Sequence, residues 1–168
     1  LNRDIVFHIC WTLPAENSEV SPVSHVNLVK LCVGADTIDD LAGWQRQRAA
    51  QARKAGGDAL PRHVTRMWPK QEQALLAGGS LYWVIRGVIL CRQTILRLDE
   101  VTGQDGIRRC GIVLDPEIHR TEAVTRRPFQ GWRYLKPADA PRDLPEGRAQ
   151  EEALPPGLSA ALAEIGVR

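Results

Sequence analysis

The chain has 168 residues, which is enough for one domain with a substantial buried core. Its 22 basic and 20 acidic residues give a formal net charge of +2, which excludes the dense positive field of a histone-like protein. Composition alone therefore argues neither for nor against nucleic acid as a partner.

The cysteines and the hydropathy pattern exclude further classes of protein. No two cysteines form a CxxC pair, so neither a zinc ribbon nor a disulfide framework is indicated, and no motif indicates a cofactor. Cysteine in apolar, strand-like runs behaves as a small hydrophobe, which predicts buried thiols. No stretch approaches the length of a membrane span. We therefore expect a reduced cytoplasmic protein with no metal site and no membrane association. The four cysteines are Cys10, Cys32, Cys91 and Cys110.

The beginning of the chain differs from the rest. Residues 18–24 are polar, contain proline and lack periodicity, as is typical of a linker. We expect residues 1–25 to be an extension or linker with little order. Residues 26–168 are then expected to form a single globular domain.

The first regular elements are a strand and a helix. Residues 26–33 form an apolar run ended by Gly34, which predicts a buried strand. Asp36 or Thr37 can cap a helix that continues to about Ala55, and residues 37–40 resemble a capping box. Glycines 56 and 57 end it. Its inner stripe is expected at Ile38, Leu41, Trp44 or Gln45, and Arg48 or Ala49.

The middle of the chain predicts strands around one short helix. Residues 63–68 alternate as a strand, and Pro69 suits the first turn of a helix that ends at glycines 78 and 79. Residues 81–98 are rich in β-branched side chains and too long for one ordinary strand, so two strands with a bend or bulge at Gly87 are expected.

A hairpin and two further strands follow. Residues 102–106 form a strong turn signal, which predicts that the preceding strand pairs with residues 107–114. Strands are expected at about residues 118–124 and 129–135, then an irregular proline-rich segment, and an amphipathic helix near residues 158–165. The fold class predicted is α+β, with a curved, mainly antiparallel sheet or small barrel flanked by helices.

Two stretches, residues 79–93 and 126–136, interleave arginines with aromatic side chains in an otherwise aromatic-poor chain. Such surfaces stack planar groups and neutralise anions, so RNA binding is the function predicted from these stretches. The predicted nucleic-acid or anion surface consists of Arg66, Trp68, Arg86, Arg127, Trp132, Arg133 and Tyr134.

Arginines within apolar strands allow a second interpretation. Such an arginine needs an anion, which is either an internal carboxylate such as Asp115 or Glu117 or a bound phosphate. The alternative function is therefore an enzyme that acts on a phosphorylated or nucleotide-like small molecule. Its predicted cleft is lined by His63, Arg66, Asp115 and Arg133. A protein-interaction module, with the acidic, proline-rich tail as its adaptable part, is a third alternative.

Five runs carry a resemblance to a known family: residues 27–35, 63–70, 78–89, 109–116 and 128–135. Together they resemble a bacterial family of uncharacterised proteins, the domain of unknown function DUF1489. The resemblance covers about residues 26–167 and implies no activity. The order of elements is more weakly similar to the small RNA-binding barrels of the PUA and ASCH type, which is an analogy of fold alone.

Overall fold

The computed structural model describes residues 25–145 of the chain. The C-terminal helix expected near residues 158–165 lies outside the described residues, as does almost all of the expected extension. In chain order the elements are β1 (Asn27–Leu31), α1 (Ile38–Lys54), β2 (Arg62–Thr65), α2 (Glu72–Leu76), β3 (Ser80–Ile85), β4 (Val88–Thr102), β5 (Arg108–Leu114), β6 (His119–Thr125), β7 (Trp132–Leu135) and a 3₁₀ turn at Pro137–Asp139.

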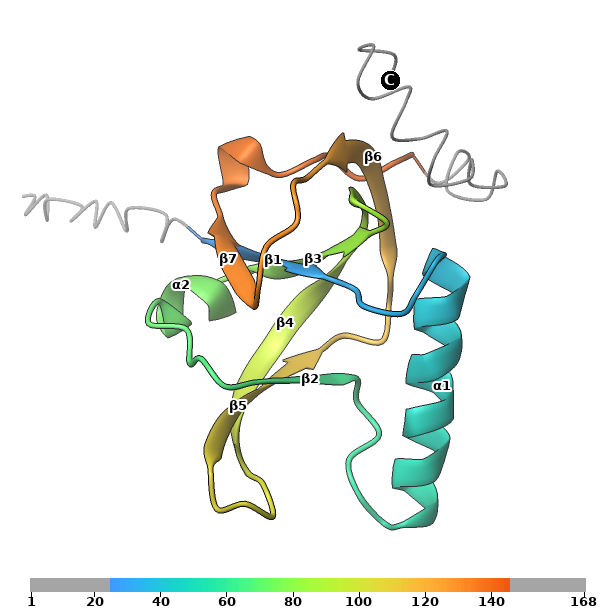
Figure 1. Cartoon of the computed structure of the whole chain (residues 1–168), viewed down its shortest axis with the longest axis vertical. Coiled ribbons are helices and arrows are strands. Elements are labelled where there is room, and N and C mark those ends of the chain that lie inside the picture. The colour runs from blue at the N-terminus through green and yellow to red at the C-terminus, as the bar shows by residue number, and fades with distance from the viewer. Residues whose placement is uncertain (1–24, 146–168) are drawn as a thin grey trace, which may run out of the picture.

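The seven strands form one open, curled sheet in the order β2-β5-β4-β3-β1-β7, with β6 paired to β4. Only β1 and β3 pair in parallel; the other pairs are antiparallel. In the view of Figure 1, α2 lies at the left and α1 at the right, and residues of both helices belong to the same core cluster. The predicted α+β class, a curved sheet flanked by helices, is confirmed.

The capping box predicted at the start of α1 is present. The Thr37 hydroxyl accepts a hydrogen bond from the Asp40 amide at 3.1 Å, and the Asp40 carboxylate accepts one from the Thr37 amide at 2.9 Å. These two bonds satisfy amide groups that the first helical turn leaves without partners. The helix ends at Lys54, and Gly56 follows with a φ of 70°.

The bend or bulge predicted at Gly87 and the turn predicted at residues 102–106 each fall between two antiparallel strands. Arg86 and Gly87 form the two-residue turn between β3 and β4, with φ angles of 49° and 85°. Gly87 therefore lies in a hairpin turn and not in a bulge within a strand. Gly106, with a φ of 69°, lies in the predicted turn between β4 and β5.

Two predicted boundaries are wrong around Trp68. β2 ends at Thr65, because after its pairing with Cys110 the chain leaves the ladder with β5 and crosses towards β7. Pro69 is buried in this crossing segment and does not begin the helix, which starts at Glu72.

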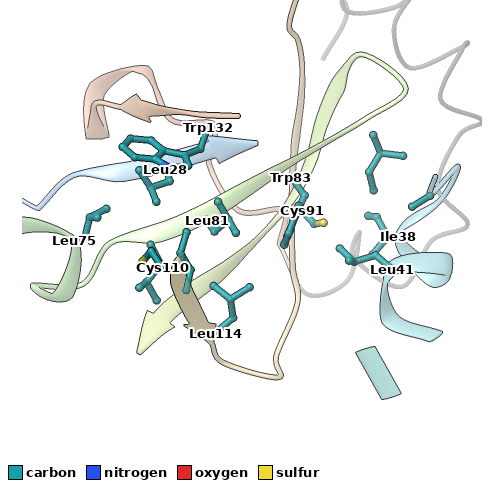
Figure 2. Packing of buried hydrophobic residues seen from close by; sticks show 14 of the residues in the cluster. Leu28, Ile38, Leu41, Leu75, Leu81, Trp83, Cys91, Cys110, Leu114 and Trp132 are labelled. Atoms are coloured by element: carbon teal, nitrogen blue, oxygen red, sulfur yellow. The ribbon is translucent and has the colours of Figure 1, made fainter. Parts of the chain in front are cut away.

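The core occupies both faces of the sheet. Leu28, Leu81 and Trp83 belong to the larger cluster, which reaches from Trp132 at one end to Leu41 of α1 at the other (Figure 2). A smaller cluster on the opposite face is covered by residues near the 3₁₀ turn. No helix within residues 25–145 is both long and apolar enough to cross a membrane.

The three cysteines in the described part of the chain are free thiols. Burial raises the pKa of Cys91 to about 12 and that of Cys110 to about 11, and it also raises the pKa of the half-buried Cys32. A thiol with a raised pKa is a weak nucleophile, so these cysteines act as small hydrophobic side chains, as predicted.

Candidate functional site

Two aromatic residues of the predicted RNA surface belong to the scaffold. Trp132 is only 5% exposed, and its indole Nε1 donates a hydrogen bond to the Met67 carbonyl at 3.0 Å. The half-buried Tyr134 contacts Trp132 edge to face at 5.0 Å, and its hydroxyl accepts a bond from the Gln71 amide at 3.0 Å. Trp132 and Tyr134 therefore join β7 to the segment between β2 and α2, and both side chains contribute to packing there.

Arg66 and Trp68 lie near this junction and are more accessible. Trp68 is half-buried, with its Nε1 3.4 Å from Glu72 Oε2 and the Arg108 guanidinium 5.6 Å from the centre of its ring. Arg66 is exposed and makes no ion pair within the described part of the chain. Of the predicted RNA surface, Arg66 and Trp68 therefore form a small accessible patch with one positive charge and one aromatic ring.

The other three arginines of the predicted surface do not join this patch. Arg86 lies in the β3–β4 turn and pairs with Asp36 at 3.2 Å. Arg127 is exposed just beyond Arg126, whose amide bonds to the Gly87 carbonyl of the same turn. The guanidinium of Arg133 donates to backbone carbonyls, including that of Gln130 at 2.8 Å. The predicted surface is thus divided among different parts of the sheet.

The carboxylate that pairs with a strand arginine is not one of those predicted, Asp115 or Glu117. Arg92 binds Asp143 through two hydrogen bonds, of 2.7 and 2.5 Å, and its Nη1 donates to Ser80 Oγ at 3.0 Å. Asp115 instead accepts a bond from the Glu117 amide in a local turn. The sequence could not identify Asp143 as the partner because it is distant in the chain and lies in an irregular segment.

A cavity of about 210 Å³ lies between α1, the α1–β2 loop and β2. Of the four residues of the predicted alternative cleft, only His63 lines it. Trp83, which is 5% exposed, is part of its wall, together with the half-buried Trp44 of α1. The cavity is lined by Leu41, Trp44, Gln45, Arg48, Ala49, Ala52, Asp58, Ala59, Leu60, Pro61, Arg62, His63, Trp83 and Leu114.

His63 is a neutral imidazole in this wall. Burial, with smaller contributions from the charges of Lys30 and Arg48, lowers the pKa of His63 to about 4. Its ring meets Trp83 edge to face at 5.7 Å, and its buried Nε2 has no hydrogen-bond partner among the described residues. At neutral pH the ring can therefore serve as an uncharged hydrogen-bonding wall of the cavity.

A polar network lies beside the aromatic wall. The fully buried Gln93 and the half-buried Gln45 pair through both amide groups, with bonds of 2.8 and 3.0 Å. Gln93 Oε1 also accepts from the Trp83 indole at 2.9 Å, and its Nε2 donates to the Asp115 carbonyl at 2.8 Å. A buried amide with every group paired is held in one orientation.

The two arginines at the cavity rim differ in whether they form ion pairs. Arg62 is 3.0 Å from Asp99 and 3.8 Å from Asp58, so its charge is largely compensated. Asp58 also pairs with Arg97. Arg48, by contrast, is exposed and makes no ion pair within residues 25–145.

Gln45, Arg48 and Gln93 were not predicted from the sequence as functional candidates. A signal was present for the first two: both belong to the inner stripe of α1, where the other positions are apolar. A polar residue at an inward position of a helix needs a partner or borders a cavity. Gln93 carries a similar signal as an amide inside the apolar run of residues 81–98.

The fold and this cavity define an α+β protein whose curled sheet carries a basic, aromatic-lined site between α1 and β2. The family model described as Protein of unknown function (DUF1489) matches residues 28–168, so the chain belongs to that family, as its sequence indicated. Neither a search of curated proteins nor a search of solved structures gave a match. The likeness to PUA and ASCH barrels is not confirmed.

Proposed function

We propose that this protein binds single-stranded RNA at the α1–β2 cavity, with a base inside the cavity and neighbouring phosphates on the arginines of its rim. The observation that carries the proposal is the combination of two tryptophans in the cavity wall with Arg48, which has no ion-pair partner in the described part of the chain. Aromatic side chains beside cations are the common means of binding unpaired nucleotides.

Further exposed charges on α1 support a polymer rather than a lone base. Arg46, Arg53 and Lys54 are exposed on α1, and none of them forms an ion pair within residues 25–145. Cations without carboxylate partners release counterions from a phosphate chain when it binds, and this release drives affinity.

A nucleotide-like small molecule is the second candidate, because His63 gives the cavity an uncharged, solvent-shielded wall. A single phosphate on Arg48 would then replace the polymer. The two candidates differ in salt dependence, since a polymer contacts several phosphates and a mononucleotide one.

The test is the affinity for a fluorescein-labelled single-stranded RNA, measured by anisotropy at several salt concentrations. Each phosphate contact contributes a slope of about −0.7 in log K against log salt. Arg48→Ala should weaken binding and make the slope shallower by about that amount. Arg142→Ala, the same change beside β6, serves as the matched control.

The competing outcomes are distinct. An effect of Arg127→Ala without an effect of Arg48→Ala would assign the RNA site to the β3–β4 turn. Absence of salt-dependent RNA binding by the wild-type protein would refute the proposal. Binding of mononucleotides alone would then favour the second candidate.

A further inference from the structure

We propose that Gln45 is the residue that discriminates between ligands in the α1–β2 cavity, by a hydrogen bond to the edge of a nucleobase. This inference deepens the proposed function and rests on it for the site, but its test needs only mononucleotides. Gln93 pairs with Gln45 and fixes the orientation of its amide.

The orientation of the Gln93 amide is determined by two groups that cannot exchange roles. The Trp83 indole Nε1 is a donor only, so the atom 2.9 Å from it must be the Gln93 oxygen. The Asp115 carbonyl is an acceptor only, so the atom 2.8 Å from it must be the Gln93 nitrogen. Turning the amide over would oppose donor to donor and acceptor to acceptor.

The orientation of the Gln93 amide fixes that of the Gln45 amide. Gln93 Oε1 accepts from Gln45 Nε2 at 2.8 Å, and Gln93 Nε2 donates to Gln45 Oε1 at 3.0 Å. The two amides therefore form a closed pair in which the positions of the Gln45 oxygen and nitrogen are set by Trp83 and Asp115. The Gln45 amide is therefore held in one orientation, and its oxygen and nitrogen do not exchange places.

The remaining hydrogen-bonding capacity of the two amides is unequal. Gln93 has two N–H groups and uses both, one on Gln45 and one on Asp115. Gln45 uses one N–H and one lone pair in the pair with Gln93, which leaves one donor and one acceptor site. Gln45 is half-buried and lines the cavity, so a ligand in the cavity can form hydrogen bonds with the free N–H group and the free acceptor site of Gln45.

This chemistry selects the class of ligand. An apolar aromatic ring in the cavity could contact Trp44 and Trp83 but would leave the free amide groups of Gln45 without partners. A nucleobase has carbonyl, amine and ring-nitrogen groups at the edge of an equally flat ring, so it satisfies both the aromatic wall and the amide. A buried polar group that one ligand pairs and another does not is a strong basis for selectivity.

The test compares AMP, CMP, GMP, UMP and ribose 5-phosphate by titration calorimetry. The wild-type protein should bind at least one nucleotide about tenfold or more tightly than the weakest nucleotide, and ribose 5-phosphate more weakly still. Gln45→Ala and the isosteric Gln45→Met should remove the preference among bases while ribose 5-phosphate binds as before. Gln47→Ala, the same change at an exposed position of α1, should alter nothing.

A second measurement needs no variant. In the wild-type protein, the side-chain amide resonances of Gln45 should shift on saturation with the preferred nucleotide, whereas those of Gln47 should not. An unchanged base preference in the Gln45 variants would overturn the inference, as would equal binding of all nucleotides or an unshifted Gln45 amide. Failure to bind an RNA oligonucleotide, with base preference intact, would refute only the proposed function.

Discussion

The indole of Trp132 donates a hydrogen bond to the carbonyl of Met67 at 3.0 Å and so joins the two edges of the sheet. β7 carries the tryptophan, and the carbonyl belongs to the segment just beyond β2. This contact between β7 and the segment beyond β2 forms the seam of the curled sheet. Hydrogen bonds between side chain and backbone hold the seam, including the one from the Gln71 amide to the Tyr134 hydroxyl.

Trp132→Phe should lower the free energy of unfolding by about 1–3 kcal/mol, because it leaves the Met67 carbonyl without its buried donor. Trp68→Phe is the matched control. The Trp68 ring is half-buried, and its Nε1 makes only a long contact of 3.4 Å with Glu72. Urea denaturation of both variants measures the difference, and equal losses would show that the seam contributes little.

Acidification should destabilise the protein through His63. The unfolded imidazole has a pKa near 6.5 and the folded one a pKa of about 4, so between these values the unfolded state binds more protons. Stability is therefore fully present above pH 6.5 and decreases as the pH falls towards 4, by up to about 3 kcal/mol from this group.

The His63→Gln variant isolates this effect. Its free energy of unfolding, measured by urea denaturation at intervals from pH 7 to 4, should fall less steeply than that of the wild-type protein. Parallel curves for the His63 variant and the wild-type protein would contradict a lowered pKa for His63.

Gly106→Val should destabilise the β4–β5 hairpin by about 1–3 kcal/mol, through backbone strain alone. The φ of 69° is unfavourable for a β-branched residue, and no atom lies within 4 Å of the position that a Cβ would take. Gly106→Asn should cost clearly less, because asparagine tolerates this backbone conformation. Thermal unfolding compares the two, and similar losses would indicate a cause other than φ.

Asp58→Asn should strengthen the binding of an anionic ligand at the cavity by about threefold, because it removes one negative charge from the rim. Asparagine can still accept the bond that the Leu60 amide makes with this side chain at 3.0 Å, so the loop should keep its course. Asp139→Asn, at the exposed 3₁₀ turn, controls for net charge. Affinity for RNA or mononucleotide is the readout, and an equal effect of both variants would exclude a local role.

Local signals predicted the elements well. The capping box at Thr37 and the turn at Gly106 depend on bonds and angles within a few residues, so the sequence contains the information directly. The start of α2 was misplaced because Pro69 is equally suited to a first helical turn and to an extended crossing segment. Only the contact between Met67 and Trp132, distant in sequence, decides between them.

The site depends on contacts that no local pattern encodes. Trp132 was assigned to a binding surface because aromatic side chains are used both in cores and in nucleotide sites, and its burial depends on how β7 meets the rest of the sheet. The pairing of Gln45 with Gln93 likewise joins a helix to a strand far along the chain. His63 was identified as a candidate, but its neighbours in the cavity were not.

The parallel pairing of β1 with β3 has a consequence for the order of folding. β3, β4 and β5 follow one another and pair with their chain neighbours, so this meander requires only short loops to close. β1 must wait for β3, which α1, β2 and α2 separate from it, and then for β7 near the end of the described chain. We therefore expect the meander to form first during synthesis. β1, which precedes the other strands of the described residues, would be among the last of them to be secured between its neighbours.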